Sequence, residues 1–406
     1  MRDLRRPVAR LSTGKTGAAL VMVLITGAAV ACSSPPGPRP RATGRTGATA
    51  RPAASVTMTG PARPPAGVNV YAHIGPGMIN PRWRGDPVRV YVPNSLSNTV
   101  TVINPQTYKV IGEFPVGTEP NHVTPSWNGS VLFVNDTAGN SLVPVNPATG
   151  RPGAPVPVAD PYNLYFTPDG SDALVMAEAF NRIDFRDPRT MRLRSSMGVP
   201  CAGVNHMDFT ADGRFAVASC EFSAQLLYIN MGTHTVAASI RTGVPTDMMR
   251  IPGGSMPQDV RLSPDGKVFY VADMIANGVW LIDATRFREI GFIHTGLGAH
   301  GLLISRDARY VFVSNRNEGS VSVISTAASA VVHTWRIPGG GSPDMGGITP
   351  DGKVMWWGGR YNGVVYAMSA TDGRLIAKIP VGAGPHGLCV FPQPGRYSLG
   401  HTGNFR

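Results

Sequence analysis

Two histidines and one aspartate occur at matching places in three consecutive repeats of this sequence. His300, Asp344 and His386 are spaced by 44 and 42 residues. Two imidazoles and a carboxylate form a ligand set that suits iron, zinc, copper or manganese, depending on the geometry. Ligand atoms must come within about 2 Å of such an ion. The set therefore predicts a transition-metal site, provided that the fold brings these three distant positions to one point.

Every repeat places a polar or ionisable side chain near the same loop, where the chain returns to the centre of the fold. The first column of equivalent positions contains Asn121, Tyr162, Asn205, Gln258, His300, Asp344 and His386. The next residues form a second column of His122, Asn163, His206, Asp259, Gly301, Met345 and Gly387. Because side chains alternate along a strand, we expect His122 and His206 to face away from the first column. The alternative to a metal site is a hydrated opening in which His and Asp satisfy loop backbone groups.

A third column is acidic in four consecutive repeats and basic in the next two. It contains Asp136, Glu178, Glu221, Asp273, Arg316 and Arg360. This division of charge would orient a zwitterionic or polar ligand or match a protein partner, and solvated turn residues are the alternative. Glu178 and Glu221 also have the residue types for acid–base cleavage of a sugar. The residues predicted to bind a ligand are His122, His206, Asp259, Glu178, Glu221, Asp273, Arg316 and Arg360.

A recurring turn positions these columns. The sequence Ser-Pro-Asp-Gly at 263–266 has close or degenerate copies that begin at 126, 167, 210, 305, 349 and near 391, which are 41 to 53 residues apart. A period in the forties suits four short strands per unit, with Gly and Asp in the turns. One such sheet cannot bury both faces alone, so the units must pack around an axis. The sequence predicts an all-β fold, a seven-bladed β-propeller of four-stranded antiparallel blades.

The two ends of the repeat region are expected to meet in one blade. The first clear strand, residues 88–92, resembles the second strand of a unit and has no innermost partner before it. The segment from Gly387 to Phe391 is the candidate for that partner. Residues 68–73 and 397–406 would then be extra strands near the seam.

Two segments resemble the repeat of the YVTN β-propeller family. They are VYVPNSLSNTVTVIN at 90–104 and VFVSNRNEGSVSVI at 311–324. The resemblance covers about residues 68–406. It implies an extracytoplasmic, YncE-like propeller, with more distant kinship to propeller lactonases and nitrous oxide reductase. A lactonase-like or lyase-like enzyme is therefore one alternative, although propellers host unrelated activities and the fold alone transfers none.

The N-terminal segment has the layout of a secretory signal peptide. Five basic residues precede an uncharged stretch at 16–31 that is too short and too one-sided for a permanent membrane span. It ends in Ala29-Val-Ala-Cys32, which resembles a bacterial lipobox with Ala29 in the usual place of Leu. We therefore predict a signal peptide at 1–31, a lipid-modified Cys32 with a disordered Pro/Ala/Gly-rich tether to residue 66, and a propeller at 67–406. Ordinary secretion with an unmodified Cys32 is the alternative.

A lipid on Cys32 would anchor the protein to the membrane on the extracytoplasmic side. Replacing Cys32 with Ala is expected to move the protein from the membrane fraction to the soluble fraction, because the acyl chains supply the membrane affinity. Cell fractionation followed by immunoblotting measures this, with Ser33→Ala as the control. A Cys32→Ala variant that stays with the membranes would contradict the anchor.

The formal net charge of +12 does not indicate a nucleic-acid-binding domain. Residues 1–64 hold ten Lys or Arg and one acid, so residues 65–406 carry only +3. A groove that follows phosphates needs a basic patch that this count does not supply. The basic tether would instead meet anionic lipid head groups.

Three cysteines follow the predicted lipidation site. Cys201 and Cys220 fall in one predicted blade, where antiparallel pairing brings them to one face, so we expect a disulfide in an oxidising compartment. Two separate thiols are the alternative. Cys389 lies in an apolar strand and is expected to be a small core residue.

These patterns favour a recognition function. A rigid, surface-tethered ring would present the loops around His300, Asp344 and His386 to a small ligand or to another extracytoplasmic protein, and no part of the sequence requires a chemical step. The alternative is a metal-dependent enzyme or electron-transfer protein that uses the same three residues as ligands. A transition-metal ion is the cofactor that this alternative implies, and nucleic acid is not an expected partner.

Overall fold

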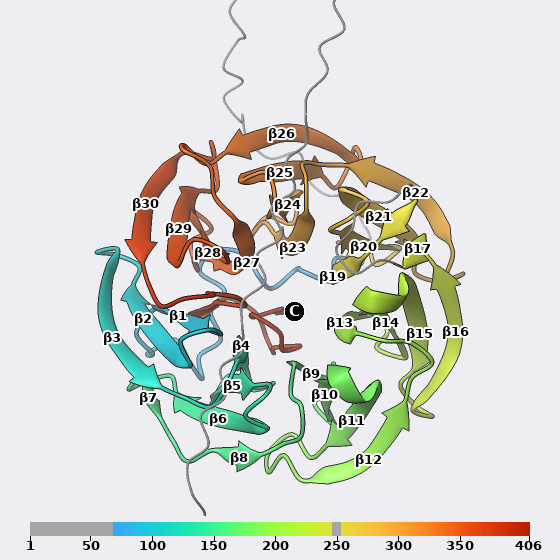
Figure 1. The fold of residues 1–406 in the computed structure, drawn as a ribbon, viewed down its shortest axis with the longest axis horizontal. Coiled ribbons are helices and arrows are strands. Elements are labelled where there is room, and N and C mark those ends of the chain that lie inside the picture. Colours follow the sequence, from blue (N-terminus) through green and yellow to red (C-terminus); the bar gives the residue numbers. More distant parts are fainter. Residues whose placement is uncertain (1–67, 246–252) are drawn as a thin grey trace, which may run out of the picture. The chain divides into compact units, whose positions relative to one another are not determined.

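The computed structural model describes residues 68–245 and 253–406. In this part of the chain, seven β-sheets surround a central channel and close into a ring (Figure 1). Neighbouring strands within these sheets pair antiparallel. The predicted seven-bladed propeller is therefore confirmed. The predicted signal peptide, the lipidation site Cys32 and the tether lie outside the described residues.

The innermost strands line the channel and the second strands pack behind them. The innermost strands are β4 (Pro120–Pro125), β9 (Asn163–Phe166), β13 (Val204–Phe209), β19 (Pro257–Leu262), β23 (Ala299–Ile304), β27 (Pro343–Ile348) and β31 (Cys389–Phe391). The second strands are β1 (Arg89–Asn94), β5 (Leu132–Asp136), β10 (Ala173–Ala177), β14 (Phe215–Cys220), β20 (Val268–Asp273), β24 (Tyr310–Asn315) and β28 (Val354–Gly359). Nearly all of these residues are buried, because each blade is covered on both faces by its neighbours.

The outer two layers complete each blade. The third strands are β2 (Thr99–Asn104), β6 (Ser141–Asn146), β11 (Arg182–Arg186), β15 (Gln225–Asn230), β21 (Gly278–Asp283), β25 (Ser320–Ser325) and β29 (Val364–Ser369). The outer strands are β3 (Lys109–Pro115), β7 (Arg151–Pro152) with β8 (Val156–Pro157), β12 (Leu193–Gly198), β16 (Thr235–Arg241), β22 (Glu289–His294), β26 (Ala330–Arg336) and β30 (Leu375–Pro380). A small parallel pair joins β17 (Val244–Pro245) to β18 (Gly254–Ser255).

The recurring turn links the first two strands of a blade through its own side chains. Ser263 Oγ donates to Asp265 Oδ1 and accepts from the amide of Val268, at 2.6 and 3.0 Å. Gly266 adopts φ +73°, the left-handed region that favours glycine. The turn residues thus satisfy the backbone groups that the strands leave unpaired.

One blade departs from the predicted pattern of four continuous strands. Its outer strand is split, and β7 and β8 pair separately with β6. Pro152, Pro155 and Pro157 have no backbone N–H to donate, which is why a continuous ladder cannot form there.

The ring closes where the first described strand, β1, meets the last, β31. β31 pairs with β1, with Val390 opposite Val90, so the segment near Gly387 supplies the missing innermost strand as expected. The extra strands expected at 68–73 and 397–406 are not formed. The first segment contains a turn, and the second makes isolated bridges such as Gly400 with Tyr165.

The C-terminal segment enters the centre of the ring (Figure 1). The amide of His401 donates to the carbonyl of Leu164 at 2.8 Å, and the amide of Phe166 donates to the carbonyl of Leu399 at 3.0 Å. Arg406 then pairs with both carboxylate oxygens of Asp208, at 2.7 and 2.9 Å. The last residues of the chain therefore lie against the inner strand β9 and are buried.

Helical structure among the described residues is limited to two short 3-10 turns. They are η1 (Glu178–Phe180) and η2 (Glu221–Ser223), and each follows the second strand of its blade. No helix in this part of the chain has the length and apolar character to cross a membrane.

Candidate functional site

The inner strands carry an irregularity at the positions of the first two columns. The register with the second strand shifts between Pro120 and His122, between Val204 and His206, and at the equivalent places of β19, β23 and β27. Such β-bulges re-aim side chains, so two consecutive residues can turn to the same side. The expectation that His122 and His206 face away from the first column is therefore wrong.

Five imidazoles meet in the channel as a result. The ring centroid of His122 lies 4.8 Å from that of His386 and 5.1 Å from that of His401. That of His206 lies 5.1 Å from His401 and 6.5 Å from His300. All five side chains are buried, none more than 2% exposed. The sequence pattern thus located four members of this cluster and missed His401.

The five imidazoles are neutral at physiological pH. Burial lowers the pKa of His300 to about 4 and holds the pKa values of His122, His206 and His386 well below their usual range. Burial also lowers the pKa of His401. Neighbouring imidazoles reinforce the shift at His206, since each would repel a proton on the next. Neutral imidazole is the form that binds a metal ion.

Three of the rings present an unpartnered nitrogen. His122 donates from Nδ1 to the carbonyl of Tyr162 at 2.8 Å, which leaves the lone pair on Nε2. The amide of Asn163 lies 3.1 Å from Nδ1 of His206 and 3.0 Å from Nδ1 of His401. Among the described residues, no hydrogen-bond partner reaches Nε2 of any of these three histidines, although Nε2 of His401 lies 3.7 Å from Asp259 Oδ1. Their Nε2 atoms are therefore the least engaged groups of the cluster.

The ligand nitrogens of His122, His206 and His401 lie within 4.8 Å of one another. Zn–N bonds of about 2.0–2.1 Å hold the ligand nitrogens of a tetrahedral ion about 3.3 Å apart, so the rings need to close by up to about 1.5 Å. The Asn163 amide must present its oxygen to both Nδ1–H groups in that state, which requires a 180° turn that gives up its bonds to the Leu164 amide and the Asn205 carbonyl. We refer to these three residues as the histidine triad.

A glycine makes room for the triad. A Cβ atom at Gly387 would stand 2.1 Å from Cδ2 of His122, so any larger residue would displace that ring. His122 is bridged to Gly387 between adjacent inner strands. The glycine of the second column is therefore part of the cradle that holds His122.

The predicted metal set, His300, Asp344 and His386, is also brought together. Its ligand atoms lie within 4.8 Å of one another, so distance does not exclude an ion there. However, Arg316 donates from Nε to Asp344 Oδ1 at 3.0 Å and from Nη2 to both Asp344 and His300 Nε2. His300 Nδ1 lies 2.9 Å from Asp344 Oδ1. A guanidinium thus occupies the place of a cation, and His300 has no free lone pair.

The pKa of Asp344 reflects its ion pair with Arg316. Burial would raise the pKa of Asp344, but Arg316, His386 and His300 outweigh it and hold that pKa well below the usual range. Asp344 is fully buried, and it is ionised because Arg316 lies beside it. Its Oδ2 has no hydrogen-bond partner and lies 3.5 Å from His386 Nε2.

Three residues predicted to bind a ligand make several contacts within the fold. Asp273 accepts from the amides of Met256, Ile275 and Ala276, from Ser255 Oγ and from Trp280 Nε1. Asp259 accepts from Arg261 and from the amides of Val260 and Leu302. Arg360 donates to Ser95 Oγ at 2.6 Å and to the carbonyl of Gly384 at 3.1 Å. Their contacts explain why these residue types recur without assigning them to a ligand.

Glu178 and Glu221 lie together on consecutive blades. The side-chain amide of Asn205 donates to Glu221. Burial and then the Glu221 carboxylate hold the pKa of Glu178 well above its usual value. Burial raises the pKa of Glu221 to about 7, although Arg316 opposes that shift. Within the acidic part of the third column, Glu221 therefore disfavours the ionised form of Glu178.

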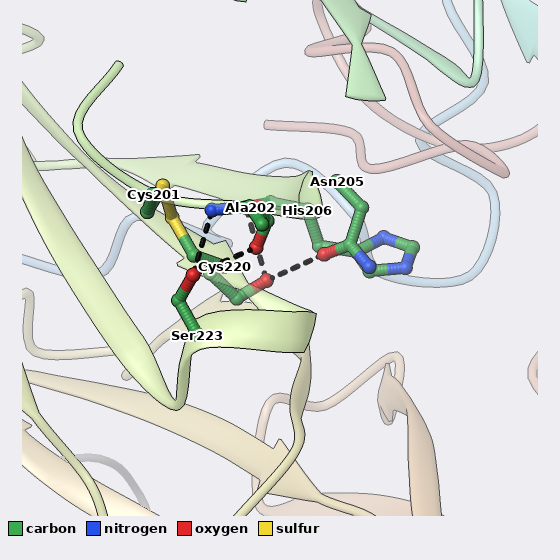
Figure 2. The surroundings of a disulfide bond; sticks show 7 residues. Cys201, Ala202, Asn205, His206, Cys220 and Ser223 are labelled. Atoms are coloured by element: carbon green, nitrogen blue, oxygen red, sulfur yellow. Dashed lines mark hydrogen bonds between the residues drawn. A yellow bond between two sulfur atoms is a disulfide. The ribbon is translucent and has the colours of Figure 1, made fainter. Parts of the chain in front are cut away.

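A disulfide fixes the strand that carries His206. Cys201 and Cys220 are bonded, and this bond joins the residues before β13 to the end of β14 (Figure 2). Ser223 Oγ accepts from the amide of Ala202 at 2.6 Å and donates to the Ala202 carbonyl at 3.3 Å. The position of His206 is thereby linked to that of η2, which carries Glu221. Cys389 is a buried free cysteine, as expected.

The sequence also matches a family of known propellers. The model of the YNCE-like beta-propeller family matches residues 85–396. The chain belongs to this family. A comparison with curated proteins found no match.

Solved structures share the fold of this YNCE-like propeller at low identity. Hydrazine synthase from Kuenenia stuttgartiensis is 21% identical, with a TM-score of 0.56 over 65% of this chain and 87% of the other. Dihydro-heme d1 dehydrogenase NirN, in complex with DHE, is 15% identical, with a TM-score of 0.55 over 78% of each chain. A functionally unknown protein from Desulfotomaculum acetoxidans is 12% identical, with a TM-score of 0.62 over 74% of this chain and 98% of that one. These likenesses support the propeller fold alone.

Proposed function

We propose that this YNCE-like propeller is a metal-binding protein. It would hold one transition-metal ion on the histidine triad at the centre of the ring, which we call the hub. The observation that carries the proposal is that ring nitrogens of His122, His206 and His401 lie within 4.8 Å of one another, and that the buried Nε2 atom of each ring has no hydrogen-bond partner among the described residues. A buried polar group without a partner costs about 1–3 kcal/mol. Three such costs at one point are offset if the nitrogens bind an ion.

The donor set indicates which ions fit. Neutral imidazole suits zinc, copper, nickel and iron, whereas magnesium and calcium prefer oxygen. Three protein ligands leave a coordination position for water or a small ligand, the arrangement of catalytic rather than structural zinc sites. The rings of Tyr162 and His386 lie 5.3 and 4.8 Å from that of His122, so they are the side chains that such a ligand would meet.

The same site favours a metal centre over simple recognition of a zwitterion. On the basic side of the opening, Arg316 is paired with Asp344, and Nη1 of Arg360 is already bonded to Ser95 and Gly384. The proposal keeps the extracytoplasmic location and the lipid anchor at Cys32, which place the hub where a small ligand or a partner protein reaches it from outside the cytoplasm. The metal ion, and not the division of acidic and basic side chains around the opening, would then determine which ligand binds.

Elemental analysis tests the proposal directly. The full chain, produced in a host that exports it and purified without affinity-tag metal or chelator, is expected to contain about one transition-metal ion per chain. Because the pKa values of His122 and His206 lie well below their usual range, protons do not compete for these ligands near neutrality, and occupancy is expected to stay constant between about pH 8 and 6.

Two variants separate the histidine triad from the predicted set. His206→Ala is expected to reduce the metal content to less than about one-tenth of an ion, because one of three ligands is lost. His300→Gln is expected to retain the ion, because His300 Nε2 is already bonded to Arg316. A wild-type chain that stays empty after incubation with zinc or copper would rule out the metal centre. Loss of metal in His300→Gln alone would assign the ion to His300, Asp344 and His386.

A further inference from the structure

The turn that begins at Ser305 carries an arginine where three other copies carry proline. Proline occupies the second place of the turn at 168, 264 and 350, whereas this copy has Arg306. The side chain reaches the next blade, where Nε donates to the carbonyl of Thr349 at 3.1 Å and Nη2 donates to that of Ile348 at 2.6 Å. Nη2 also donates to Gln393 Oε1 at 2.9 Å. Arg306 is therefore directed into the fold and is only 8% exposed.

Arg306 is a buried charge that forms no ion pair within the described part of the chain. Its three acceptors are two backbone carbonyls and an amide oxygen, all of them uncharged. Burial lowers the pKa of Arg306 to about 9, so the guanidinium is still charged at pH 7. Asp351, the acid that opposes this shift, instead pairs with Lys353 at 3.8 Å. A buried charge without a counter-charge is costly, and a bound anion would relieve that cost.

A small cavity lies against this guanidinium. Arg306 lines it together with Arg261 of β19 and with Thr402 and Asn404 of the C-terminal segment. No acidic residue of the described chain is part of the lining. The cavity has a volume of about 30 Å³, and a cavity needs about 10–15 Å³ to hold one water molecule. It therefore has room for a small anion.

Donors from three parts of the fold face this cavity without an acceptor. Nδ2 of Asn404 is buried and has no hydrogen-bond partner, and the residue is only 5% exposed. Arg261 donates from Nη1 to Asp259 Oδ1 at 2.7 Å and to the carbonyl of Val260 at 3.0 Å. Its Nε and Nη2 bond no described residue, and neither does Nη1 of Arg306. The Nε and Nη2 donors lie on one edge of a guanidinium, which binds a planar oxyanion through two parallel hydrogen bonds.

The arginines around the cavity lack one negative charge. Arg261 is paired with Asp259 at 2.7 Å. Arg406, which ends the segment that lines the cavity, is paired with Asp208 at 2.7 Å. Arg306 is the remaining arginine of the three, and its acceptors carry no charge. One monovalent anion would therefore balance this group.

We propose that the cavity binds one small, planar, monovalent oxyanion between Arg306 and Arg261, with Asn404 as a further donor. Formate and nitrate represent this class, since each carries a single negative charge on coplanar oxygens. The anion would connect β19, the turn after β23 and the C-terminal segment. None of the three histidine ligands takes part, so the anion site does not depend on the proposed metal centre.

Isothermal titration calorimetry of the full chain with sodium formate and with sodium nitrate tests the anion site. The protein is first transferred to a buffer whose only small anion is gluconate, which is too large for a cavity of about 30 Å³. One anion per chain is expected. Binding of formate alone would assign the site to carboxylates, binding of nitrate alone would assign it to inorganic oxyanions, and binding of both would assign it to the shared planar shape.

Two substitutions inside the cavity are expected to weaken the binding. Arg306→Met should weaken it at least about tenfold, because a hydrogen bond to a charged group contributes about 1.5–3 kcal/mol. Asn404→Leu removes a neutral donor of similar size and should weaken it about tenfold or less. Arg288→Met changes an exposed arginine next to β22 and is the matched control, which should bind like the wild type. Circular dichroism checks that each variant is folded, and Asn404→Leu decides the test if Arg306→Met does not fold.

The metal ligands provide a second comparison. His206→Ala is expected to keep its affinity for the anion while it loses its transition metal, and Arg306→Met is expected to show the reverse. The anion site would be overturned if neither formate nor nitrate bound at about 100 mM, a concentration at which a ligand with a millimolar dissociation constant nearly saturates its site. An affinity that Asn404→Leu and a folded Arg306→Met both leave unchanged would overturn it as well.

Discussion

Replacing Arg316 with Met is expected to lower the free energy of unfolding by about 3–5 kcal/mol. The change removes a guanidinium that donates to Asp344 and His300, while the methionine fills much of the same volume. Asp344 would then be a fully buried carboxylate without its principal cation. The cost comes from that uncompensated charge more than from the lost contacts. Urea-induced unfolding at pH 7, followed by circular dichroism, measures the difference.

The double variant Arg316→Met, Asp344→Leu is the control for this interpretation. Replacing both partners of a buried pair with apolar residues of similar size is often neutral, so most of the lost stability should return. If the double variant is as unstable as Arg316→Met, the loss lies in packing around position 316 and not in charge. An Arg316→Met variant as stable as the wild type would contradict the ion pair as a structural element.

The Arg316→Met variant also tests whether the guanidinium of Arg316 keeps a metal ion away from His300 and Asp344. The substitution frees His300 Nε2 and Asp344 Oδ1, which the arginine occupies in the wild type. The two histidines and the carboxylate would then match the composition of a transition-metal site. Arg316 therefore explains why two neighbouring clusters of similar composition differ in their free lone pairs.

The sequence was sufficient to predict the ring. The turn at Ser263 repeats because its side-chain hydrogen bonds and the left-handed Gly266 are needed each time the chain leaves the channel. Local chemistry of this kind is visible in one repeat and is confirmed by the next. The pairing of β31 with β1 was also predictable, since the first blade lacked an innermost strand. The split of the outer strand into β7 and β8 was not predicted, although three prolines occur in that segment.

The site was predicted less completely, for two physical reasons. Strict alternation along a strand turns His122 away from the channel, but the bulge between Pro120 and His122 breaks that alternation. A bulge has no sequence signature as strong as a turn. The partner that neutralises Asp344 was also hidden, because Arg316 belongs to a different column and the contact depends on side-chain reach.

The third triad ligand could not be placed from the repeat at all. His401 follows the last repeat, and its position depends on how the C-terminal segment docks on β9. That docking uses backbone bonds to Leu164 and Phe166 and the ion pair between Arg406 and Asp208. None of these is periodic. The hub is thus a site made partly by the repeat and partly by the single segment that breaks it.

Metal affinity should therefore depend on the C-terminal segment. Deleting residues 397–406 is expected to weaken binding of zinc to the triad at least about 100-fold, beyond the 10–100-fold that loss of an outer-shell partner costs. The deletion removes His401 and the contacts that hold it against β9. Competition with a chromophoric zinc chelator measures the affinity.

His401→Gln separates the loss of the ligand from the loss of the segment. It should match the deletion in zinc affinity while keeping the Arg406–Asp208 pair, so its stability without metal should stay closer to that of the wild type. His294→Gln, on the exposed end of β22, is the matched control and should bind zinc normally. If His401→Gln binds zinc as tightly as the wild type, the ion does not use the C-terminal segment, and the two histidines of the repeat must find their third ligand in His386 or Asp344.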